Sequence, residues 1–330
     1  MADIALTLAI GEYDHVRDLT GGPVRATGID LTWLDLGVEE IFDRFTAFRE
    51  WDVSEMSLGR YVALVSRDDP GLTAIPVFVS RMFRHSAFYV RRGSGIQAPR
   101  DLVNRRVGIP EWSQTAGIYG RGMLAHQYGV PLHLVEWHQA GLDEPGRVEA
   151  VDGDIPNGVR LVRRPDRSLS QMLLSGEVDC VLSARPPAAF ASGDPRLARL
   201  FPEFPAVEQD YYRATGIFPV MHLIAIRREI VDRHPWVPLN LMKAFEEARD
   251  RSIARMRDMT ASYYPVPWLQ EITREVHALS GDDPWPYGIE ANRPTLQAFL
   301  RYCHEQGVAR RLLRPEELFP RPVRSMRSRI

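Results

Sequence analysis

The chain has 330 residues, enough for two domains or two lobes that each bury a hydrophobic core. Its composition is that of an ordinary globular protein, with 45% hydrophobic and 25% charged residues, and a formal net charge of -2 gives no reason to expect nucleic acid or an anionic membrane as partner. Cys180 and Cys303 are too far apart to form a CxxC pair, so we expect neither a disulfide framework nor a structural zinc site.

The N-terminal residues lead directly into an alternating apolar pattern at residues 4–10, which is typical of a β-strand. No basic segment, long apolar core or small-residue cleavage site precedes this strand, as a signal peptide would require. No apolar run approaches the roughly 18 residues of a membrane span. We therefore expect a cytoplasmic protein without a membrane partner.

Strand-like and helix-like segments alternate along most of the chain, which favours an α/β protein with largely parallel sheets. Helical apolar spacing occurs at residues 41–48 and 58–65, and Ser113 is a suitable N-cap for a helix that reaches about residue 127. Short helices are expected at 99–102 and 170–175. Strands are expected at residues 4–10, 31–36, 52–56, 73–79, 87–91, 106–110, 132–137, 159–162 and 178–183.

The last third of the chain begins with one more strand, at residues 220–226, and is mainly helical after it, with a long amphipathic helix from about 236 to 259. The pattern predicts two lobes, one formed by residues 1–92 and 218–330 and the other by the inserted residues 93–217. Two chain crossings would act as a hinge, and a ligand would bind at the C-terminal ends of the strands. The arginine-rich residues 321–330 are expected to form a frayed basic tail.

The run Arg81, Met82, Phe83, Arg84 and His85 lies at the first expected crossing between the lobes. A guanidinium group binds a carboxylate in a bidentate manner, an aromatic side chain can stack on a ring, and a histidine can transfer a proton near neutral pH. The run therefore suits an aromatic acid. Taken alone, however, so short a run is more typical of a solvated basic turn that closes a strand.

Two segments resemble the ligand-binding elements of type II periplasmic-binding-protein-like domains. One is DLVNRRVGIP at 101–110, followed by SQT at 113–115, and the other is SGEVDCVL at 175–182. Their order and spacing agree with that superfamily. The resemblance implies a two-lobed fold with the ligand cleft between the lobes.

Residues 4 to 319 resemble more closely the 4,5-dihydroxyphthalate decarboxylase family, which is a cytosolic branch of the same fold. Several of the segments that carry it are long and rich in Trp, Pro, His and Arg. They are AIGEYDH (9–15), DVSEMSL (52–58), IPVF (75–78), FRHS (83–86), GLDEPGRVE (141–149), LSAR (182–185), YYR (211–213), TGIFPVMH (215–222), HPW (234–236) and GDDPWPYG (281–288).

The resemblance implies a role in phthalate catabolism, namely decarboxylation of a hydroxylated aromatic dicarboxylic acid. The expected reaction converts 4,5-dihydroxyphthalate to 3,4-dihydroxybenzoate and carbon dioxide by protonation of the ring carbon that bears the departing carboxylate. This chemistry needs no redox cofactor, so we expect no cofactor and no metal ion. The partner is then a small aromatic acid, and a homo-oligomer is compatible with the sequence.

The reaction needs a cationic clamp for the carboxylate that is retained and a proton donor for the ring carbon. For the clamp we favour Arg84, then Arg81 and Arg185, because a charge-assisted bond contributes on the order of 1.5–3 kcal/mol. For the donor we favour His85, with His222 second because it lies on the expected strand at the second crossing. Both assignments compete with ordinary roles, since most arginines form surface ion pairs and most single histidines are structural.

Acceptors for the phenolic hydroxyls are expected at the ends of strands in the first lobe. Glu12, Asp14 and His15 follow the first strand, with Glu12 grouped with the catalytic residues, and Glu55 and Ser57 end another strand. For Asp14, helix capping is an equally good role. In the second lobe, Ser113 and Thr115 open a helix whose free N–H groups can bind a carboxylate.

Three alternatives remain open at this point. A binding protein for a small anion would use the same fold and the same arginines, although the expected lack of an export signal counts against it. A pyrimidine synthase of thiamine biosynthesis would need a cysteine-rich motif that two cysteines cannot supply. A metal site formed by Asp14, His15, His85 and His222 lacks any recognisable ligand spacing. The exact aromatic acid is also open.

Overall fold

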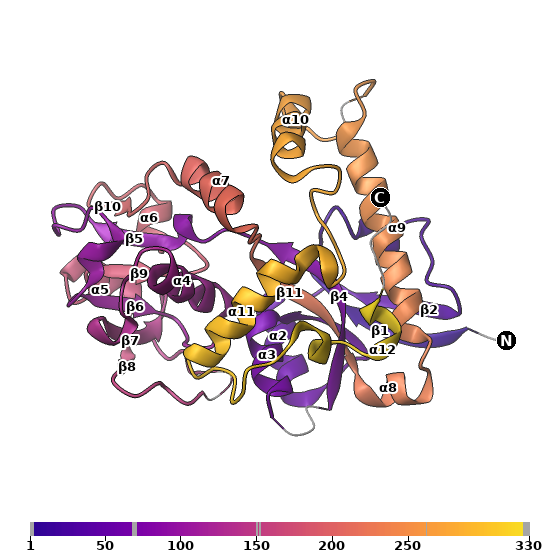
Figure 1. Cartoon of the computed structure of the whole chain (residues 1–330), viewed down its shortest axis with the longest axis horizontal. Coiled ribbons are helices and arrows are strands. Elements are labelled where there is room, and N and C mark those ends of the chain that lie inside the picture. The colour runs from indigo at the N-terminus through magenta and orange to yellow at the C-terminus, as the bar shows by residue number, and fades with distance from the viewer. Residues whose placement is uncertain (1–2, 68–70, 150, 152, 262, 326–330) are drawn as a thin grey trace.

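The computed structural model of the chain describes residues 3–67, 71–149, 151, 153–261 and 263–325. Two lobes lie side by side, each built on its own β-sheet with helices packed around it (Figure 1). This mixed α/β, two-lobed architecture confirms the fold class that the alternating pattern predicts.

The sheet of the first lobe has the strand order β2-β1-β3-β11-β4. Strand β1 is parallel to β2 and β3, whereas β11 runs antiparallel between β3 and β4. β3 is buried along its whole length, as expected for a central strand covered on both faces. The strands are β1 (Ile4–Ala9), β2 (Ile29–Leu34), β3 (Val53–Ser57), β4 (Leu72–Arg81) and β11 (Val220–Arg227).

The sheet of the second lobe has the strand order β10-β5-β9-β6-β7-β8. Its β9, β6, β7 and β8 are parallel, and β5 and β10 complete the sheet in antiparallel pairings. The strands are β5 (Phe88–Arg91), β6 (Arg106–Ile109), β7 (Glu136–Gly141), β8 (Arg160–Ser168), β9 (Cys180–Leu182) and β10 (Leu197–Arg199).

Helices connect the strands and also make up most of the C-terminal third. Those that follow strands of the first lobe, or lie beyond β11, are α1 (Arg17–Thr20), α2 (Val38–Phe48), α3 (Leu58–Val65), α8 (Arg228–Arg233), α9 (Val237–Arg257), α10 (Leu269–Ser280), α11 (Arg293–Glu305) and α12 (Arg321–Arg324). Those of the second lobe are α4 (Thr115–His126), α5 (Leu169–Ser175), α6 (Ala188–Ala191) and α7 (Phe204–Thr215). Short 3₁₀ helices occupy His85–Ala87, Pro99–Leu102, Leu132–Leu134, Glu290–Asn292 and Pro315–Leu318.

The chain passes between the sheets twice, from β4 to β5 and from α7 to β11. The two crossings are tied together, because the backbone N–H of Met82 donates to the carbonyl of Pro219 at 3.1 Å. Strand β5 pairs in the second sheet, although the expected boundary at residue 92 leaves it with the first lobe. The lobe boundaries themselves remain a prediction.

Helix α11 makes a further connection between the lobes, because it packs against α4 of the second lobe and α3 of the first (Figure 1). Tyr119 on α4 contacts Phe299 on α11, with ring centroids 4.6 Å apart. Just beyond α11, the carbonyl of Gln306 accepts a hydrogen bond of 2.7 Å from the indole of Trp112. The C-terminal part of the chain therefore restrains how far the lobes can separate.

Several local expectations differ from the structure. Ser113 does not cap α4, whose N-cap is Gln114, because the Ser113 hydroxyl is engaged by Glu149. Residues 132–134 form a 3₁₀ turn, and the strand expected at 132–137 starts at Glu136 instead. In the expected tail, α12 buries Val323, while 326–330 lie outside the described residues. No helix within the described residues is long and apolar enough to cross a membrane.

The contact of α4 with α11 depends on a glycine. A Cβ on Gly122 would collide with the ring of Tyr302, which is buried between Tyr119 and His126 and cannot move aside. We expect Gly122→Ala to lower the free energy of unfolding by about 1–2 kcal/mol, because overpacking outweighs the gain in helix propensity. Urea unfolding measures the change.

Gly21→Ala is the matched control, since a Cβ at Gly21 meets nothing within 4 Å. Equal stability of the Gly122→Ala and wild-type proteins would contradict the close packing of α4 on α11.

Candidate active site

A cavity of about 160 Å³ lies between the two lobes, where strands of both sheets end. Five residues expected in the site line it: Ser57, Arg84, Thr115, Arg185 and His222. Ser57 ends β3, Thr115 begins α4 after β6, and Arg185 follows β9. The cavity therefore occupies the position that α/β sheets offer to a ligand.

His222 is held by a buried carboxylate on the neighbouring strand. It lies opposite Ser57 in the pairing of β11 with β3, and its Nδ1 is 2.6 Å from Oε1 of Glu55. The hydroxyl of Tyr13 donates to the same oxygen at 2.6 Å, and the N–H of Gly11 donates to Oε2 at 2.9 Å. Glu55 thereby joins the end of β1, the end of β3 and the start of β11.

These contacts determine the charge of Glu55. Burial alone raises the pKa of a carboxyl group, but hydrogen bonds from His222, Tyr13 and Gly11 reverse the effect and lower the pKa of Glu55 overall. Burial and the nearby Glu55 raise the pKa of Tyr13, so its hydroxyl keeps its proton and donates it. An ionised Glu55 can only accept a hydrogen bond, so its contact with His222 requires a proton on Nδ1. The other ring nitrogen, Nε2, is then available to a ligand in the cavity.

Nε2 of His222 forms no hydrogen bond with the residues that the structure describes. The ring packs edge-on against Phe42, with centroids 4.8 Å apart, and 19% of the side chain is exposed. His222 thus combines a fixed ring orientation with a nitrogen that a ligand can reach.

Arg84 brings a buried positive charge to the cavity wall. Its Nε donates to the sulfur of Met221 at 3.2 Å, and its Nη1 donates to the carbonyl of Ala184 at 3.4 Å. It forms no ion pair with any of the described residues, and burial lowers its pKa to about 10. A buried guanidinium without a carboxylate partner is well suited to an anionic ligand.

Ion pairs link the lobes around the cavity. Arg147 of the second lobe contacts Glu111 at 2.6 Å and reaches Glu39 on α2 at 3.5 Å, and Arg185 also reaches Glu39 at 3.5 Å. Arg60 on α3 lies 3.7 Å from the other oxygen of Glu111. The wall of the cavity therefore contains two glutamates and three further arginines besides Arg84.

The first turns of α3 and α4 approach each other closely at the same place. The Ser57 and Thr115 hydroxyl oxygens are 2.9 Å apart, and the N–H of Gly59 donates to Thr115 Oγ1 at 2.9 Å. A Cβ on Gly59 would lie 2.5 Å from the carbonyl of Ser113, so only glycine permits this approach. Two helix N-termini, one from each lobe, are thus brought to the cavity.

His85 does not line this cavity. It is 1% exposed, packs among Tyr128, Phe201 and Tyr211 in the second lobe, and has no hydrogen-bond partner for either ring nitrogen among the described residues. Burial lowers its pKa to about 4, so the ring is neutral at pH 7. The structure thus places His85 in a packing position and His222 at the cavity.

Arg81, Ser113 and Glu12 also lie outside the set of residues that line the cavity. Arg81 is buried and donates to Asn292 Oδ1 at 2.5 Å and to the carbonyls of Phe218 and Pro286. Ser113 is bonded to Glu149, and Glu12 is exposed to solvent. Arg81 therefore joins the hinge to the C-terminal region and is not placed to bind a ligand.

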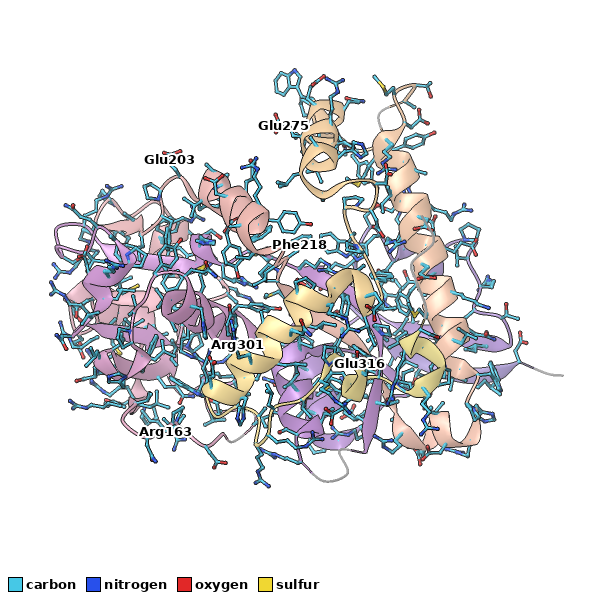
Figure 2. All side chains as sticks on the ribbon, in the orientation of Figure 1. Arg163, Glu203, Phe218, Glu275, Arg301 and Glu316 are labelled. Carbon is cyan, nitrogen blue, oxygen red and sulfur yellow. The ribbon has the colours of Figure 1, made fainter. Side chains whose placement is uncertain are left out.

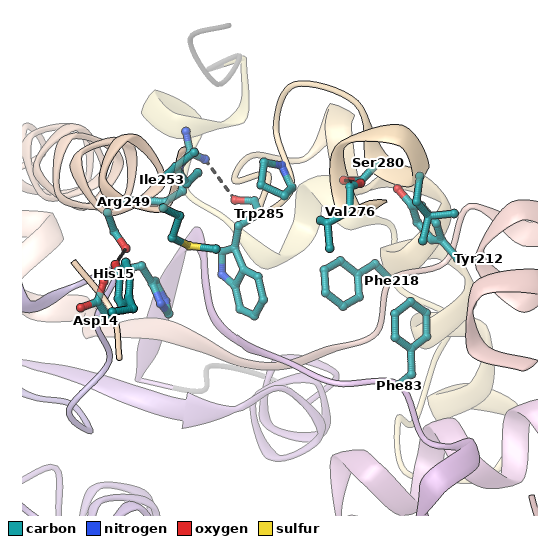
Figure 3. Close-up of a pocket in the computed structure, with 15 residues that line it drawn as sticks. Asp14, His15, Phe83, Tyr212, Phe218, Arg249, Ile253, Val276, Ser280 and Trp285 are labelled. Carbon is teal, nitrogen blue, oxygen red and sulfur yellow. Dashed lines mark hydrogen bonds between the residues drawn. The ribbon is translucent and has the colours of Figure 1, made fainter. Parts of the chain in front are cut away.

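Asp14 and His15 line a different cavity, of about 420 Å³, between α9, α10 and the hinge (Figure 3). Asp14 accepts a hydrogen bond of 2.6 Å from Ser252 and pairs with Arg17 at 2.9 Å, and its side chain caps no helix. Burial lowers the pKa of His15 to about 4. Among the described residues, no three His, Cys, Asp or Glu side chains are grouped so that they could hold a metal ion.

The sequence analysis missed Arg60, Glu111 and Glu39 and did not include Arg147 among the site residues. Ser57 was expected in the site because it lies at the end of a strand. The same argument applies to Arg60, three residues later, and to Glu111, which directly follows the strand expected at 106–110. Glu39 carries no comparable signal, because it belongs to a helix that faces the other lobe only in the folded chain.

Comparisons with known proteins agree with this geometry. No protein-family model matches the chain. In structure, it is similar to the periplasmic aliphatic sulphonate binding protein SsuA of Escherichia coli, with a TM-score of 0.53 and 12% identity, covering 100% of this chain and 96% of that one. The alkanesulfonate-binding protein SsuA of Xanthomonas axonopodis gives a TM-score of 0.51 at 12% identity, covering 97% and 99%. These likenesses confirm the type II periplasmic-binding-protein-like fold.

In sequence, the chain is 36% identical over 322 residues to a 4,5-dihydroxyphthalate decarboxylase of Comamonas testosteroni, a match that covers 97% of both proteins. It is 34% identical over 215 residues to a protein of the same name from Pseudomonas putida, covering 65% of this chain and 83% of the relative. The motifs distributed over residues 4 to 319 thus reflect common descent, and the chain belongs to the 4,5-dihydroxyphthalate decarboxylase family.

Proposed function

We propose that the chain is a carboxy-lyase that converts 4,5-dihydroxyphthalate to 3,4-dihydroxybenzoate and carbon dioxide in the cavity between the lobes. The names of its relatives support the reaction class. The observation that carries the assignment is the pairing of His222 with the buried Glu55 beside Arg84, a cation without a carboxylate partner among the described residues.

Substrate binding rests on charge in this proposal. Arg84 takes the carboxylate that remains on the ring, and the positive ends of the α3 and α4 helix dipoles add to the field at the negative end of the substrate. Phe42, Met221 and Ala184 supply apolar surface. An apolar surrounding favours loss of carbon dioxide, because it stabilises the neutral product relative to the carboxylate.

The hydroxyl groups need acceptors, and the structure suggests a revised set. Glu12, Asp14 and His15 lie away from the cavity, whereas Glu39 and Glu111 line it. Glu111 is 4% exposed and bound to Arg147, while Glu39 is about half exposed and held only by contacts of 3.5 Å. Glu39 is therefore the better acceptor for a phenolic hydroxyl, since it can turn without breaking a short ion pair.

The chemistry starts at the hydroxyl para to the departing carboxylate. As its proton shifts to the acceptor, electron density rises at the ring carbon that bears the carboxylate, and His222 Nε2 transfers a proton to that carbon. The bond between the ring and the carboxylate then breaks, its electrons restore the aromatic ring, and carbon dioxide leaves. The phenolate that forms takes its proton back from the acceptor. Each turnover therefore consumes one proton net, the one donated from Nε2 by a His222 ring that carries a proton on both nitrogens; solvent returns it, and no electrons are gained or lost.

Turnover of the named acid tests the proposal directly. The purified chain is incubated with 4,5-dihydroxyphthalate labelled with ¹³C in its carboxyl groups, and labelled carbon dioxide and 3,4-dihydroxybenzoate are quantified. We expect equal amounts of both products. Tight binding without release of carbon dioxide would instead indicate a binding protein, and release only from another hydroxylated aromatic acid would assign a different substrate.

The donor assignment predicts unequal effects of two histidine substitutions. His222→Asn removes the proton donor and should lower kcat by about 10²–10⁴-fold, the usual worth of general acid catalysis. His85→Asn, the matched control, should change kcat severalfold at most. Steady-state kinetics of both variants, with circular dichroism to verify folding, make the comparison. A large loss in His85→Asn with near-normal His222→Asn would reverse the assignment.

The clamp assignment predicts a binding defect. Arg84→Gln removes a buried charge that faces the carboxylate and should reduce kcat/KM by roughly 10- to 150-fold, which corresponds to about 1.5–3 kcal/mol. Arg213→Gln, at an exposed position of α7, serves as the control. Unchanged kinetics in Arg84→Gln would remove Arg84 from the site.

A further inference from the structure

Helix α10 and the segment that leads into it, residues 259–261 and 263–280, form an arm that projects away from both lobes (Figures 1 and 2). No residue of α10 is buried. The described residues expose twelve large apolar side chains, and half of them lie on this arm. These six are Met259, Tyr263, Val266, Trp268, Ile272 and Val276.

The arm is not a stable unit by itself. An isolated helix of about 12 residues is marginal in water, and helices in proteins owe most of their stability to an apolar face that packs on something else. Leu269, Ile272, Val276 and Leu279 follow the three-four-three spacing of such a face. Val276 and Leu279 line the 420 Å³ cavity beside Trp285, but Ile272 is 47% exposed.

The exposed surface has the size of an interface. With aromatic side chains worth about 150–250 Å² each, the exposed fractions of the six side chains amount to on the order of 600 Å². A stable dimer buries roughly 800 Å² on each partner, while a monomer rarely exposes apolar patches of more than a few hundred Å². The arm alone thus supplies most of one side of a dimer interface.

Charge and shape indicate which partner fits. Helix α10 carries Glu271, Arg274 and Glu275, and Glu271 is paired with Arg274 at 2.6 Å. A helix that lies on an anionic membrane has a polar face rich in Lys and Arg, which α10 lacks. Trp268 and Ile272 are exposed on the arm. Val276 and Ser280, which follow them on α10, line the apolar cavity (Figure 3).

We propose that this arm is a dimer interface, in which the arm of each copy packs against the arm and the 420 Å³ cavity of a second copy. The cavity wall also includes Phe83 and Phe218, which lie on the two crossings between the lobes and stack at 5.0 Å. The interface is therefore adjacent to the hinge, while the cavity that contains His222 lies outside it.

Sedimentation equilibrium of the full chain at micromolar concentration tests the proposal. We expect wild-type protein to have at least twice the 37.6 kDa mass of one chain. Trp268→Asp and Ile272→Asp should each halve the observed mass, because they place a charge in the interface. Phe48→Asp, at a position 71% exposed on α2, is the matched control and should leave the mass unchanged.

Circular dichroism and thermal melting show whether each variant is folded, and the exposure of Trp268 makes its substitution the safer of the two. A monomeric wild-type chain, a mass that survives both arm substitutions, or an equal loss in Phe48→Asp would overturn the proposal. Binding of the wild-type monomer to vesicles of anionic phospholipid would overturn it in favour of a membrane.

Discussion

The buried carboxylate of Glu55 is the contact on which the site depends. A charge inside a protein is tolerated only when its lone pairs are satisfied, and Glu55 receives hydrogen bonds from the first strand's loop and from β11. Strand β11 follows the second lobe in the chain. The contact between Glu55 and His222 therefore joins two residues that are 167 positions apart. The same bonds that stabilise the charge also orient His222.

The small cavity follows from how closely the lobes approach. Glycine at position 59 lets the first turns of α3 and α4 touch, the ion pairs of Arg147 and Arg185 with Glu39 cross the gap, and α11 packs on both lobes. The chain itself crosses between the lobes twice, from β4 to β5 and from α7 to β11. Here the third connection limits the opening, and an enzyme that must exclude water around a reactive ring benefits from that limit.

The two-lobed fold could be predicted from the sequence because alternating strands and helices define the sheets. Three of the candidate residues that line the cavity were also suggested by local features: Ser57 by the end of a strand, Thr115 by the start of a helix, and Arg185 by the need for a cationic clamp. The choice between His85 and His222 could not be made in this way. Phe201 and Tyr211, more than a hundred residues further along the chain, bury His85, and only tertiary packing shows this.

Charge pairing was equally difficult to foresee. Arg84 and Arg81 are three residues apart and chemically identical, yet Arg84 faces the cavity, whereas Arg81 bonds to Asn292 and to two carbonyls, one on the hinge and one in the C-terminal region. Arg81 is the last residue of β4, whereas Arg84 lies in the turn that precedes a 3₁₀ helix, so the two side chains leave the backbone in different settings.

A crystal structure with phthalate, which lacks the hydroxyls needed for reaction, tests the central claim most directly. The account predicts that phthalate binds between the lobes with one carboxylate on Arg84 and the ring carbon of the other carboxylate within reach of His222 Nε2. Phthalate bound beside Trp285 in the other cavity, or against His85, would contradict it.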